Sequence, residues 1–422
     1  MVTIVGAGPA GATAARTLAQ AGVTVRLLDR SNFPRNKPCG GGISLRVLKR
    51  FPYLERELGR IATHRVSRLY LEGPDGESTV VQSDEPAALM VRRVEFDAML
   101  VDLAVEAGAE LTTGAEIVQA STGASGVRLT ARDGRRFEAG RVIAADGVNS
   151  VVARRLGLNP GWRRSAVALD MMEETPRTAL RDVDPSTLWV AYGFDPKMGR
   201  RDLRPRSRRG ATSEGYAYIF PKRDHVNVGI GYVLDHYRAA IDVPPYELQR
   251  GFVSHLKSRG ILEGESVERN FTPFLIPIAG PLRRPGQGPV LLAGDAGGFV
   301  NGFTAEGIYY AMVSGELAAR SMIDTPEGSE TGLAGRYRRA CDHEIGAELR
   351  DSVLIQQYLF GHRRRITKVI DGANRDPDMT KRVLEFAIGR TPYRDLRRRM
   401  LARSPLLALR FAWERFRHAC RL

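Results

Sequence analysis

Short apolar runs and one glycine-rich turn organise the first thirty residues. Residues 2–5 form a β-branched apolar run that is typical of a buried strand, and the alanine-rich stretch 12–20 predicts a helix that ends at Gly22. A second apolar run, 23–28, closes on Asp29. This order predicts a strand, a helix and a second strand in quick succession, which is how α/β folds with parallel strands begin.

Further apolar runs end in polar turns. An amphipathic helix is expected to begin at Arg93, because apolar residues recur after it at helical spacing. Two strand-like runs turn through aspartates, one through Asp146-Gly147 and one through Gly294-Asp295. After the second turn a helix is expected to begin near Thr304.

The C-terminal part, from Arg336 to Leu422, is helix-like, with long charged and apolar stretches. Ser404 and Pro405 read as the N-cap and first residue of a final helix. Apolar residues then recur on one stripe between arginines: Leu406, Leu409, Trp413, Phe416 and Cys420. Such a helix either packs on the body of the protein by this stripe or lies on an anionic bilayer surface, and both interpretations stay open.

Composition places the chain among ordinary soluble proteins. Its 422 residues suffice for two or three sub-domains, with 43% apolar and 26% charged residues. Cys39, Cys341 and Cys420 are an odd set without paired spacing, which argues against disulfides and a zinc site and favours a reducing compartment. No signal peptide or spanning apolar run is expected, so the predicted location is cytoplasmic, with peripheral contact at the inner membrane face as an option.

The net charge of +15 is concentrated in two zones. Residues 361–422 hold 17 Lys and Arg against 6 Asp and Glu, and residues 199–210 hold six Arg and one Asp. The zones suggest contact with an anionic membrane or a diphosphate head group, or simply a solvated basic surface. Nucleic acid is not expected as a partner, because neither zone carries a nucleic-acid-binding motif or interleaved aromatic residues.

The glycine-rich turn GAGPAG has the spacing of a dinucleotide-binding loop. Gly6 permits the tight turn, Gly8 lets the backbone approach a pyrophosphate, and Gly11 lets the helix pack on the strand. The helix N-terminus offers N–H groups to the phosphates, and Asp29 is placed to accept hydrogen bonds from ribose hydroxyls. This unit predicts a bound dinucleotide without distinguishing FAD from NAD.

The later acidic turns favour FAD. An acid at the end of a strand, followed by a helix N-terminus, suits a polyol and a ring carbonyl. Asp295 is therefore expected to bond ribityl hydroxyls, while the following helix stabilises negative charge on a reduced flavin ring.

These motifs together resemble a known group of flavoproteins. GAGPAG, the RxxFD segment at Arg93, the Asp146-Gly147 turn and the GDA at 294–296 are similar to those of the FAD-dependent group that includes para-hydroxybenzoate hydroxylase, flavin halogenases and geranylgeranyl reductases. The resemblance covers residues 1 to about 325.

The resemblance implies an α/β fold with a discontinuous Rossmann-type FAD-binding domain. That domain is expected over 1–62, 92–160 and 285–330. An inserted, mainly antiparallel β-sheet substrate domain is expected over 63–91 and 161–284, and a helical C-terminal region over 331–422.

Three segments point within this group to the geranylgeranyl reductases. The loop 33–42 (FPRNKPCGGG) looks like their PxxKPCGGG loop, which lies over the flavin. Residues 216–231 resemble their YxWxFPK…VGxG strand pair, with Tyr218 at the usual Trp. Residues 294–319 are close to their GDAAGFVNPxTGEGI segment, with Gly302 at a usual proline and Ala305 at a usual glycine. The departures put the seat of the flavin ring and detailed substrate contacts in question.

The resemblance implies an FAD-dependent reductase that hydrogenates double bonds of a geranylgeranyl or other isoprenoid chain by hydride transfer from flavin N5. Cys39, Tyr216, Tyr218 or a trapped water is expected to supply the proton. No second GxGxxG is present that would mark a separate NAD(P)H site. The electron donor therefore stays open between NAD(P)H, ferredoxin and another electron-donor protein. The partner is an isoprenoid lipid or prenyl diphosphate.

Residue chemistry and the resemblance together assign the cofactor site. No metal is expected. The expected cofactor-binding residues are Gly6, Gly8, Ala10, Gly11, Asp29, Arg30, Cys39, Gly40, Gly42, Arg93, Asp146, Gly147, Gly294, Asp295, Gly307 and Ile308.

Two other functions remain open alternatives. One is a flavin-dependent monooxygenase acting on an aromatic or polyketide-like substrate. The other is a flavoprotein that modifies a protein partner.

Overall fold

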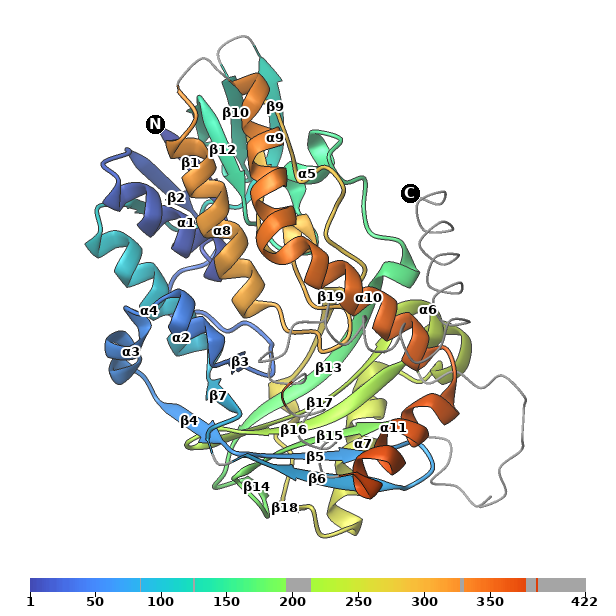
Figure 1. The fold of residues 1–422 in the computed structure, drawn as a ribbon. Helices are drawn as coiled ribbons and strands as arrows, with labels where there is room; N and C mark the ends of the chain where they lie inside the picture. The colour runs from blue at the N-terminus through green and yellow to red at the C-terminus, as the bar shows by residue number, and fades with distance from the viewer. Residues whose placement is uncertain (84, 124–125, 195–213, 327–329, 377–384, 386–422) are drawn as a thin grey trace.

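Two β-sheets and the helices that cover and join them build the molecule (Figure 1). The computed structural model describes residues 1–83, 85–123, 126–194, 214–326, 330–376 and 385. The basic stretch 199–210 and the apolar stripe expected after residue 404 lie outside these residues. Within them, no helix combines the length and apolar character needed to cross a membrane.

The first sheet has six strands in the order β20-β21-β12-β1-β2-β8, parallel except for the β20–β21 pair. Its central strands are buried along their whole length, as expected for parallel strands covered on both faces. The strands are β1 (Val2–Val5), β2 (Val25–Leu28), β8 (Glu110–Thr112), β12 (Arg141–Ala144), β20 (Gly286–Gln287) and β21 (Val290–Leu292).

Helices cover one face of this sheet and a small antiparallel sheet covers the other. The helical side consists of α1 (Pro9–Gln20), α4 (Arg93–Glu106) and α8 (Ile308–Ile323), whose apolar residues form one core with the strands. The opposite side consists of β9 (Ile117–Gly123), β10 (Gly126–Ala131), β11 (Arg136–Ala139) and α5 (Val151–Arg155).

Two of these helices begin at other residues than predicted. Helix α1 begins at Pro9 instead of residue 12, because proline is pre-organised for the first helical position. Helix α8 begins at Ile308 instead of Thr304. The Asn301 side chain accepts the Thr304 N–H, and Ala305 adopts a left-handed conformation (φ 56°), so the chain cannot enter the helix earlier.

The second sheet has seven strands in the order β19-β13-β17-β16-β15-β5-β6, antiparallel except for β15–β5. Helix α7 (Pro245–Ser258) packs on one face of it. The strands are β5 (Arg68–Glu72), β6 (Ser78–Gln82), β13 (Val167–Pro176), β15 (Thr187–Tyr192), β16 (Gly215–Pro221), β17 (His225–Val233) and β19 (Phe271–Pro277).

Smaller elements complete the body. Two short sheets consist of β3 (Gly42–Ser44), β4 (Thr63–Val66) and β7 (Ala88–Val91), and of β14 (Leu180–Asp182) and β18 (Leu262–Gly264). The short helices are α2 (Arg46–Arg50), α3 (Leu54–Glu57), η1 (Leu58–Arg60), η2 (Arg164–Ala166), α6 (Leu234–His236), η3 (Tyr237–Ile241), η4 (Glu268–Asn270) and η5 (Gly294–Gly297).

The C-terminal helices run from the first sheet to the second (Figure 1). Near the first sheet lie α9 (Glu330–Cys341) and η6 (Asp342–Gly346), and α10 (Ala347–Phe360) and α11 (Arg363–Arg375) continue to the second. The predicted α/β class, with a mainly antiparallel second sheet and C-terminal helices, is confirmed. The exact domain boundaries stay a prediction.

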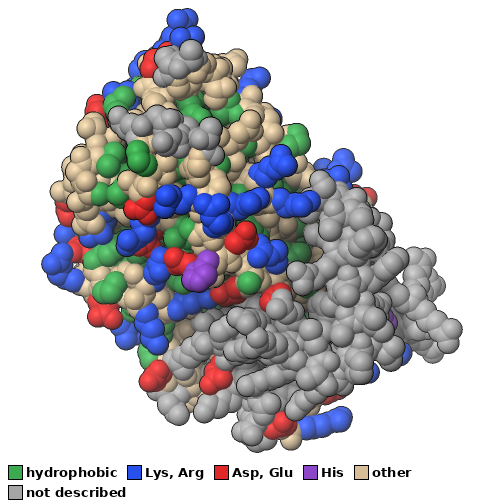
Figure 2. All heavy atoms as spheres, turned by 45° about the horizontal axis from the view of Figure 1, so that its top comes forward, with side chains coloured by type: hydrophobic (Ala, Val, Ile, Leu, Met, Phe, Trp, Pro, Cys, Tyr) green, Lys and Arg blue, Asp and Glu red, His purple; other side chains and the backbone are tan. Residues whose placement is uncertain are grey.

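The described surface carries charges of both signs. A band of Lys and Arg side chains crosses the middle of the face in Figure 2, and Asp and Glu side chains lie close to it. This mixture agrees with the near-neutral balance of the chain outside its two basic zones.

Candidate active site

The glycine-rich turn between β1 and α1 is shaped by close backbone packing. Gly6 has a φ of 96°, and a Cβ there would lie 2.3 Å from the Ala145 carbonyl oxygen. A Cβ on Gly11 would lie 1.8 Å from the Gly6 oxygen. At Gly8 the nearest atom would be the Arg35 Nη2, 3.6 Å away, so the turn is open at the helix N-terminus. Open space beside free helix N–H groups fits a pyrophosphate.

Asp29, Ala10 and Arg30 surround this turn in different ways. The buried Asp29 carboxylate accepts the Ala7 N–H at 2.7 Å and the Ser31 N–H at 2.8 Å. These bonds orient the carboxylate, which keeps lone pairs for ribose hydroxyls. Ala10 is buried where α8 approaches α1, whereas the side chain of Arg30 is exposed.

Two other predicted turns meet the glycine-rich turn. Gly294, with a φ of 60°, lies against α1, since its Cβ would come within 3.0 Å of the Ala10 Cβ. Asp146 uses Oδ2 to accept the Val151 N–H at 2.8 Å and so caps α5. Its Oδ1 is buried and has no protein hydrogen-bond partner, and burial raises the pKa of the carboxyl. Gly147, with a φ of 83°, has open space beside it.

Asp295 and the N-terminus of α8 lie together, as the motif predicts. The N-cap residue Gly307 has no side chain to cap the helix, and its Cβ would lie 3.7 Å from the Asp295 Oδ1. Ile308, the first helical residue, is buried. Burial raises the pKa of Asp295, while the positive charges of Lys37 and Arg93 lower it.

Buried cations surround this acid. Arg93 forms a bidentate pair with the fully buried Asp97, with distances of 2.6 and 2.8 Å. Lys37 lies with its Nζ 5.0 Å from the Phe274 ring centroid. Burial lowers the pKa of Lys37, and the Arg93 charge lowers it further. Positive charge next to a polyol-binding acid suits a reduced, anionic flavin ring.

These features fit FAD. The open glycine turn suits the pyrophosphate, and the uncapped N-terminus of α8 suits the carbonyl edge of the ring. The buried Oδ1 of Asp146 has no hydrogen-bond donor within the protein, and a hydroxyl of the cofactor would supply one.

Side chains from the second sheet hold the Cys39–Gly42 loop. The Lys222 ammonium donates to the Gly40 carbonyl at 2.9 Å and pairs with Glu174 at 2.9 Å. The Asn227 amide donates to the Cys39 carbonyl at 3.1 Å. Both donors are buried, so the loop is fastened to the sheet by polar contacts screened from water.

Protein packing accounts for two glycines of this loop. A Cβ on Gly40 would lie 2.6 Å from the Phe220 ring, and one on Gly41 would lie 2.1 Å from the Val91 oxygen. A Cβ on Gly42 would make only ordinary contacts. The resemblance places this loop over the flavin, but packing against Phe220 and Val91 already requires glycine at positions 40 and 41.

The two predicted tyrosines are adjacent, with ring centroids 6.2 Å apart. The Tyr216 hydroxyl donates to the Thr304 carbonyl at 2.7 Å. The buried Tyr218 hydroxyl donates to Asp170 Oδ2 at 3.3 Å. Asp170 is a candidate site residue that the motifs did not identify. The only feature of the sequence that marks Asp170 is its position as an acid within the apolar first part of β13.

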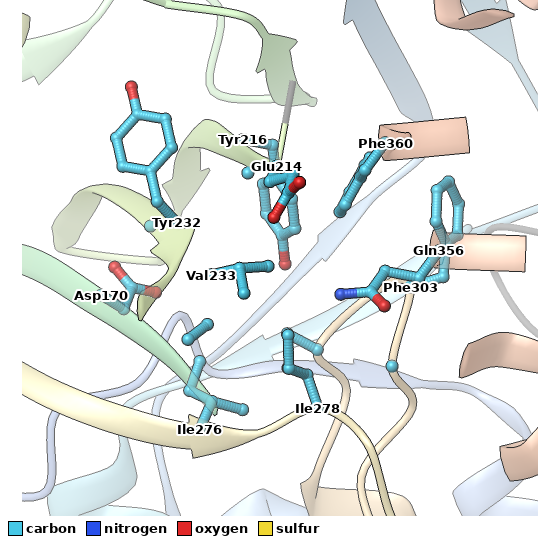
Figure 3. Close-up of a pocket in the computed structure, with 15 residues that line it drawn as sticks. Asp170, Glu214, Tyr216, Tyr232, Val233, Ile276, Ile278, Phe303, Gln356 and Phe360 are labelled. Atoms are coloured by element: carbon cyan, nitrogen blue, oxygen red, sulfur yellow. The ribbon is translucent and has the colours of Figure 1, made fainter. Parts of the chain in front are cut away.

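A pocket lies between the second sheet, the loop before α8 and helix α10 (Figure 3). It holds about 380 Å³ of space, open solvent at its mouth included. Asp170 and Tyr216 project from the sheet, and Gln356 and Phe360 face them from α10. The lining also includes Ala168, Glu214, Gly215, Gly231, Tyr232, Val233, Ile276, Ile278, Gly302, Phe303 and Ala305.

The departures Gly302 and Ala305 both line this pocket. The Gly302 N–H donates to the Ser352 hydroxyl at 2.8 Å, which a proline could not do. A Cβ at this position would also lie 2.6 Å from the Ile278 oxygen. In this chain the turn at Gly302 is therefore held by a hydrogen bond to α10 in place of the usual proline.

Comparisons with known proteins identify the family of the chain. A family model described as "FAD binding domain" matches residues 1–229. The chain is 32% identical over 352 residues to the menaquinone reductase of Mycobacterium tuberculosis, covering 80% of each. It is 32% identical to digeranylgeranylglycerophospholipid reductase 1 of Methanopyrus kandleri, covering 82% of this chain and 86% of that one.

A solved structure supports the fold. The geranylgeranyl bacteriochlorophyll reductase-like protein of Thermoplasma acidophilum superimposes with a TM-score of 0.72 at 21% identity, over 88% of this chain and 90% of that one. The chain is an FAD-binding oxidoreductase and belongs to the geranylgeranyl reductase family.

Proposed function

We propose that this protein uses FAD to hydrogenate carbon–carbon double bonds of an isoprenoid chain. The pocket beside the Cys39–Gly42 side of the second sheet carries the proposal. Most of its lining is aliphatic, aromatic or glycine, and a few polar groups such as Asp170 and Gln356 interrupt it, as in other small-molecule sites. An isoprenoid chain has no polar group along its length, so such a lining suits it.

The relatives support the same chemistry. Two of them are named as reductases of a menaquinone and of a digeranylgeranylglycerophospholipid. We propose an isoprenoid lipid or prenyl diphosphate as the substrate class here. The electron donor is NAD(P)H or a ferredoxin-type protein. Peripheral contact with an anionic membrane would supply a lipid substrate.

Named residues would hold the cofactor. Gly8 and the N-terminus of α1 would bind the pyrophosphate, Asp29 the ribose, Asp295 the ribityl chain, and Gly307 and Ile308 the ring edge. Reduced FAD, when bound, supplies a hydride to one carbon of the double bond.

The protein's own contribution is orientation and exclusion of water. An unactivated alkene offers no carbonyl for the protein to polarise, so placing it correctly matters most. Phe303 and Phe360 cover the pocket opposite the sheet, and their rings contact each other in a tilted arrangement with centroids 5.8 Å apart. The Lys222 and Asn227 bonds hold the Cys39 loop at a fixed position against the same sheet.

An anaerobic turnover experiment tests the function. The holoenzyme is photoreduced, mixed with a panel of geranylgeranyl diphosphate, menaquinone and a digeranylgeranyl ether lipid, and the products are weighed by mass spectrometry. We expect a gain of two hydrogens per reduced bond in at least one substrate. Products that gain oxygen when air is admitted, with no hydrogenated product across the panel, would show a monooxygenase instead.

A further inference from the structure

Hydrogenation of an alkene consumes one proton for every hydride, and the donor must reach the pocket. The Tyr216 hydroxyl is bonded to the Thr304 carbonyl. Burial raises the pKa of the Tyr218 phenol well above 10.0, which makes it a poor acid. The Cys39 sulfur accepts the Gly41 N–H at 3.4 Å, and Cys39 is not among the residues that line this pocket. The three groups expected from the sequence are therefore poorly suited to donate.

Asp170 is better placed than any of these three. It lies in β13, opposite Gly231 of β17 and Phe274 of β19, and its side chain points into the pocket (Figure 3). The side chain is buried, with 6% of the residue exposed. Its Oδ2 accepts the Tyr218 hydroxyl at 3.3 Å, while its Oδ1 is buried without a hydrogen-bond partner. A buried oxygen without a hydrogen-bond partner either destabilises the fold or has a functional role.

Two glycines of β17 make room for this pair. A Cβ on Gly229 would lie 2.3 Å from the Tyr218 hydroxyl oxygen. A Cβ on Gly231 would lie 3.3 Å from the Asp170 carboxyl carbon. Glycine inside a strand weakens it, so two of them in alternate positions indicate a requirement for the space they leave. The VGIG pattern thus serves the Tyr218–Asp170 pair.

The surroundings of Asp170 favour the protonated form of its carboxyl at pH values near 7. Burial raises the pKa of its carboxyl to about 7, and this outweighs the Tyr218 hydrogen bond and the Lys37 charge, which both lower it. The titratable groups around it are Tyr218 from β16 and Lys37 from the loop after β2, and Glu214, Tyr216 and Tyr232 line the same pocket. A carboxyl with a pKa near the working pH is suited to general acid catalysis.

We infer that Asp170 is the catalytic acid of the proposed hydrogenation and that Tyr218 is the residue that positions it. The inference rests on the proposed function. One alkene carbon gains a C–H bond from the hydride of the reduced cofactor. The π electron pair forms the second C–H bond with the proton of the Asp170 carboxyl, which becomes a carboxylate. The alkene is thereby reduced by two electrons, the cofactor is oxidised by two, and water returns the proton to Asp170.

The test compares Asp170→Asn with the wild-type holoenzyme in anaerobic single turnovers with geranylgeranyl diphosphate. We expect the wild-type rate to fall as the pH rises through about 7, because the acid loses its proton. Asp170→Asn should be slower by about 10²- to 10⁴-fold, without that pH dependence. Binding of geranylgeranyl diphosphate and reoxidation by oxygen should change by less than about 3-fold.

Glu173→Gln is the matched control. Glu173 lies on the same strand, is fully buried, and has a pKa raised by burial to about 7, but its carboxyl bonds Ser266 and does not line the pocket. Its rate should stay within about 2-fold of wild type. A rate for Asp170→Asn within about 3-fold of wild type, with the pH profile retained, would overturn the assignment.

Tyr218→Phe supplies an independent readout if Asp170→Asn fails to bind FAD. The Tyr218 bond lowers the pKa of Asp170, so its removal should move the falling limb of the pH profile to higher pH. An unmoved limb would refute the pairing. If wild type hydrogenates none of the panel, the proposed function itself fails; if it does and the variants match it, only the acid is misassigned.

Discussion

Glu173 makes the stability of this protein depend on pH in a calculable way. Its side chain is fully buried beneath α7, where Oε2 has no hydrogen-bond partner and Oε1 accepts only a long bond of 3.4 Å from Ser266. Burial raises the pKa of the carboxyl from 4.5 to about 7. The neutral form is therefore the one that the fold accommodates.

The sign follows from the raised pKa. The stabilising contribution is fully present below pH 4.5, where folded and unfolded chains both hold the proton, and it is lost as the pH rises through about 7. The difference between 4.5 and about 7 corresponds to about 3 kcal/mol. Glu173→Gln keeps a neutral side chain of the same shape at every pH and removes this dependence.

Thermal and urea unfolding across about pH 5 to 9 measure the effect. At the acidic end the variant should match wild type within about 1 kcal/mol. At the alkaline end it should be more stable by up to about 3 kcal/mol, or about 3 °C in midpoint for a chain of this length. Glu55→Gln, at an exposed position of α3, controls for the change in net charge. A stability difference between Glu173→Gln and wild type that stays constant with pH would refute the reasoning.

Four further variants probe the cofactor turn and the pocket wall. Ala305→Gly should raise the free energy of unfolding in urea by up to about 1 kcal/mol. Glycine adopts the left-handed conformation without strain, and this gain exceeds the added entropy of the unfolded chain. A lower free energy of unfolding would contradict this. Gly302→Pro should lower the free energy of unfolding by about 2 to 4 kcal/mol, because it removes the hydrogen bond to Ser352 and adds a clash. Ser352→Ala removes only the hydrogen bond and should cost about 1 kcal/mol. Equal losses for the two variants would exclude the clash. Gly11→Ala should abolish FAD retention, read from the flavin absorbance of the purified protein, because its Cβ would meet the Gly6 oxygen; full occupancy would disprove the packing requirement.

The cofactor half was largely predictable from the residues. Strands β1 and β12 are covered on both faces, so each appears in the chain as a mostly apolar run, in which Thr3 and Arg141 are the exceptions. Gly11 is required by its contact with the Gly6 oxygen and Gly6 by its positive φ, and such local requirements leave a readable pattern. The start of α8 was misplaced because the left-handed Ala305 has no sequence signal of its own.

The pocket half was less predictable because its contacts join distant segments. The Asp170–Tyr218 pair depends on strand register across β13, β17 and β16, which periodicity does not specify. The Cys39 loop was recognised, but its anchors Lys222 and Asn227 are nearly two hundred residues away in sequence. Gly40 illustrates the same limit, because the ring that requires glycine there belongs to Phe220.

The order of strands in the first sheet has a consequence for biosynthesis. The ribosome synthesises β1 first. Its neighbour β12 ends at residue 144, and the next strand of the sheet, β21, begins only at residue 290. At about 5 to 20 residues per second, the ribosome needs roughly 7 to 30 s to extend the chain from the end of β12 to the start of β21. During this time β12 presents an open edge, and the acid at residue 295 has not emerged. Cofactor capture is thus a late event, and a nascent chain stalled before residue 290 exposes an edge that invites chaperone binding or aggregation.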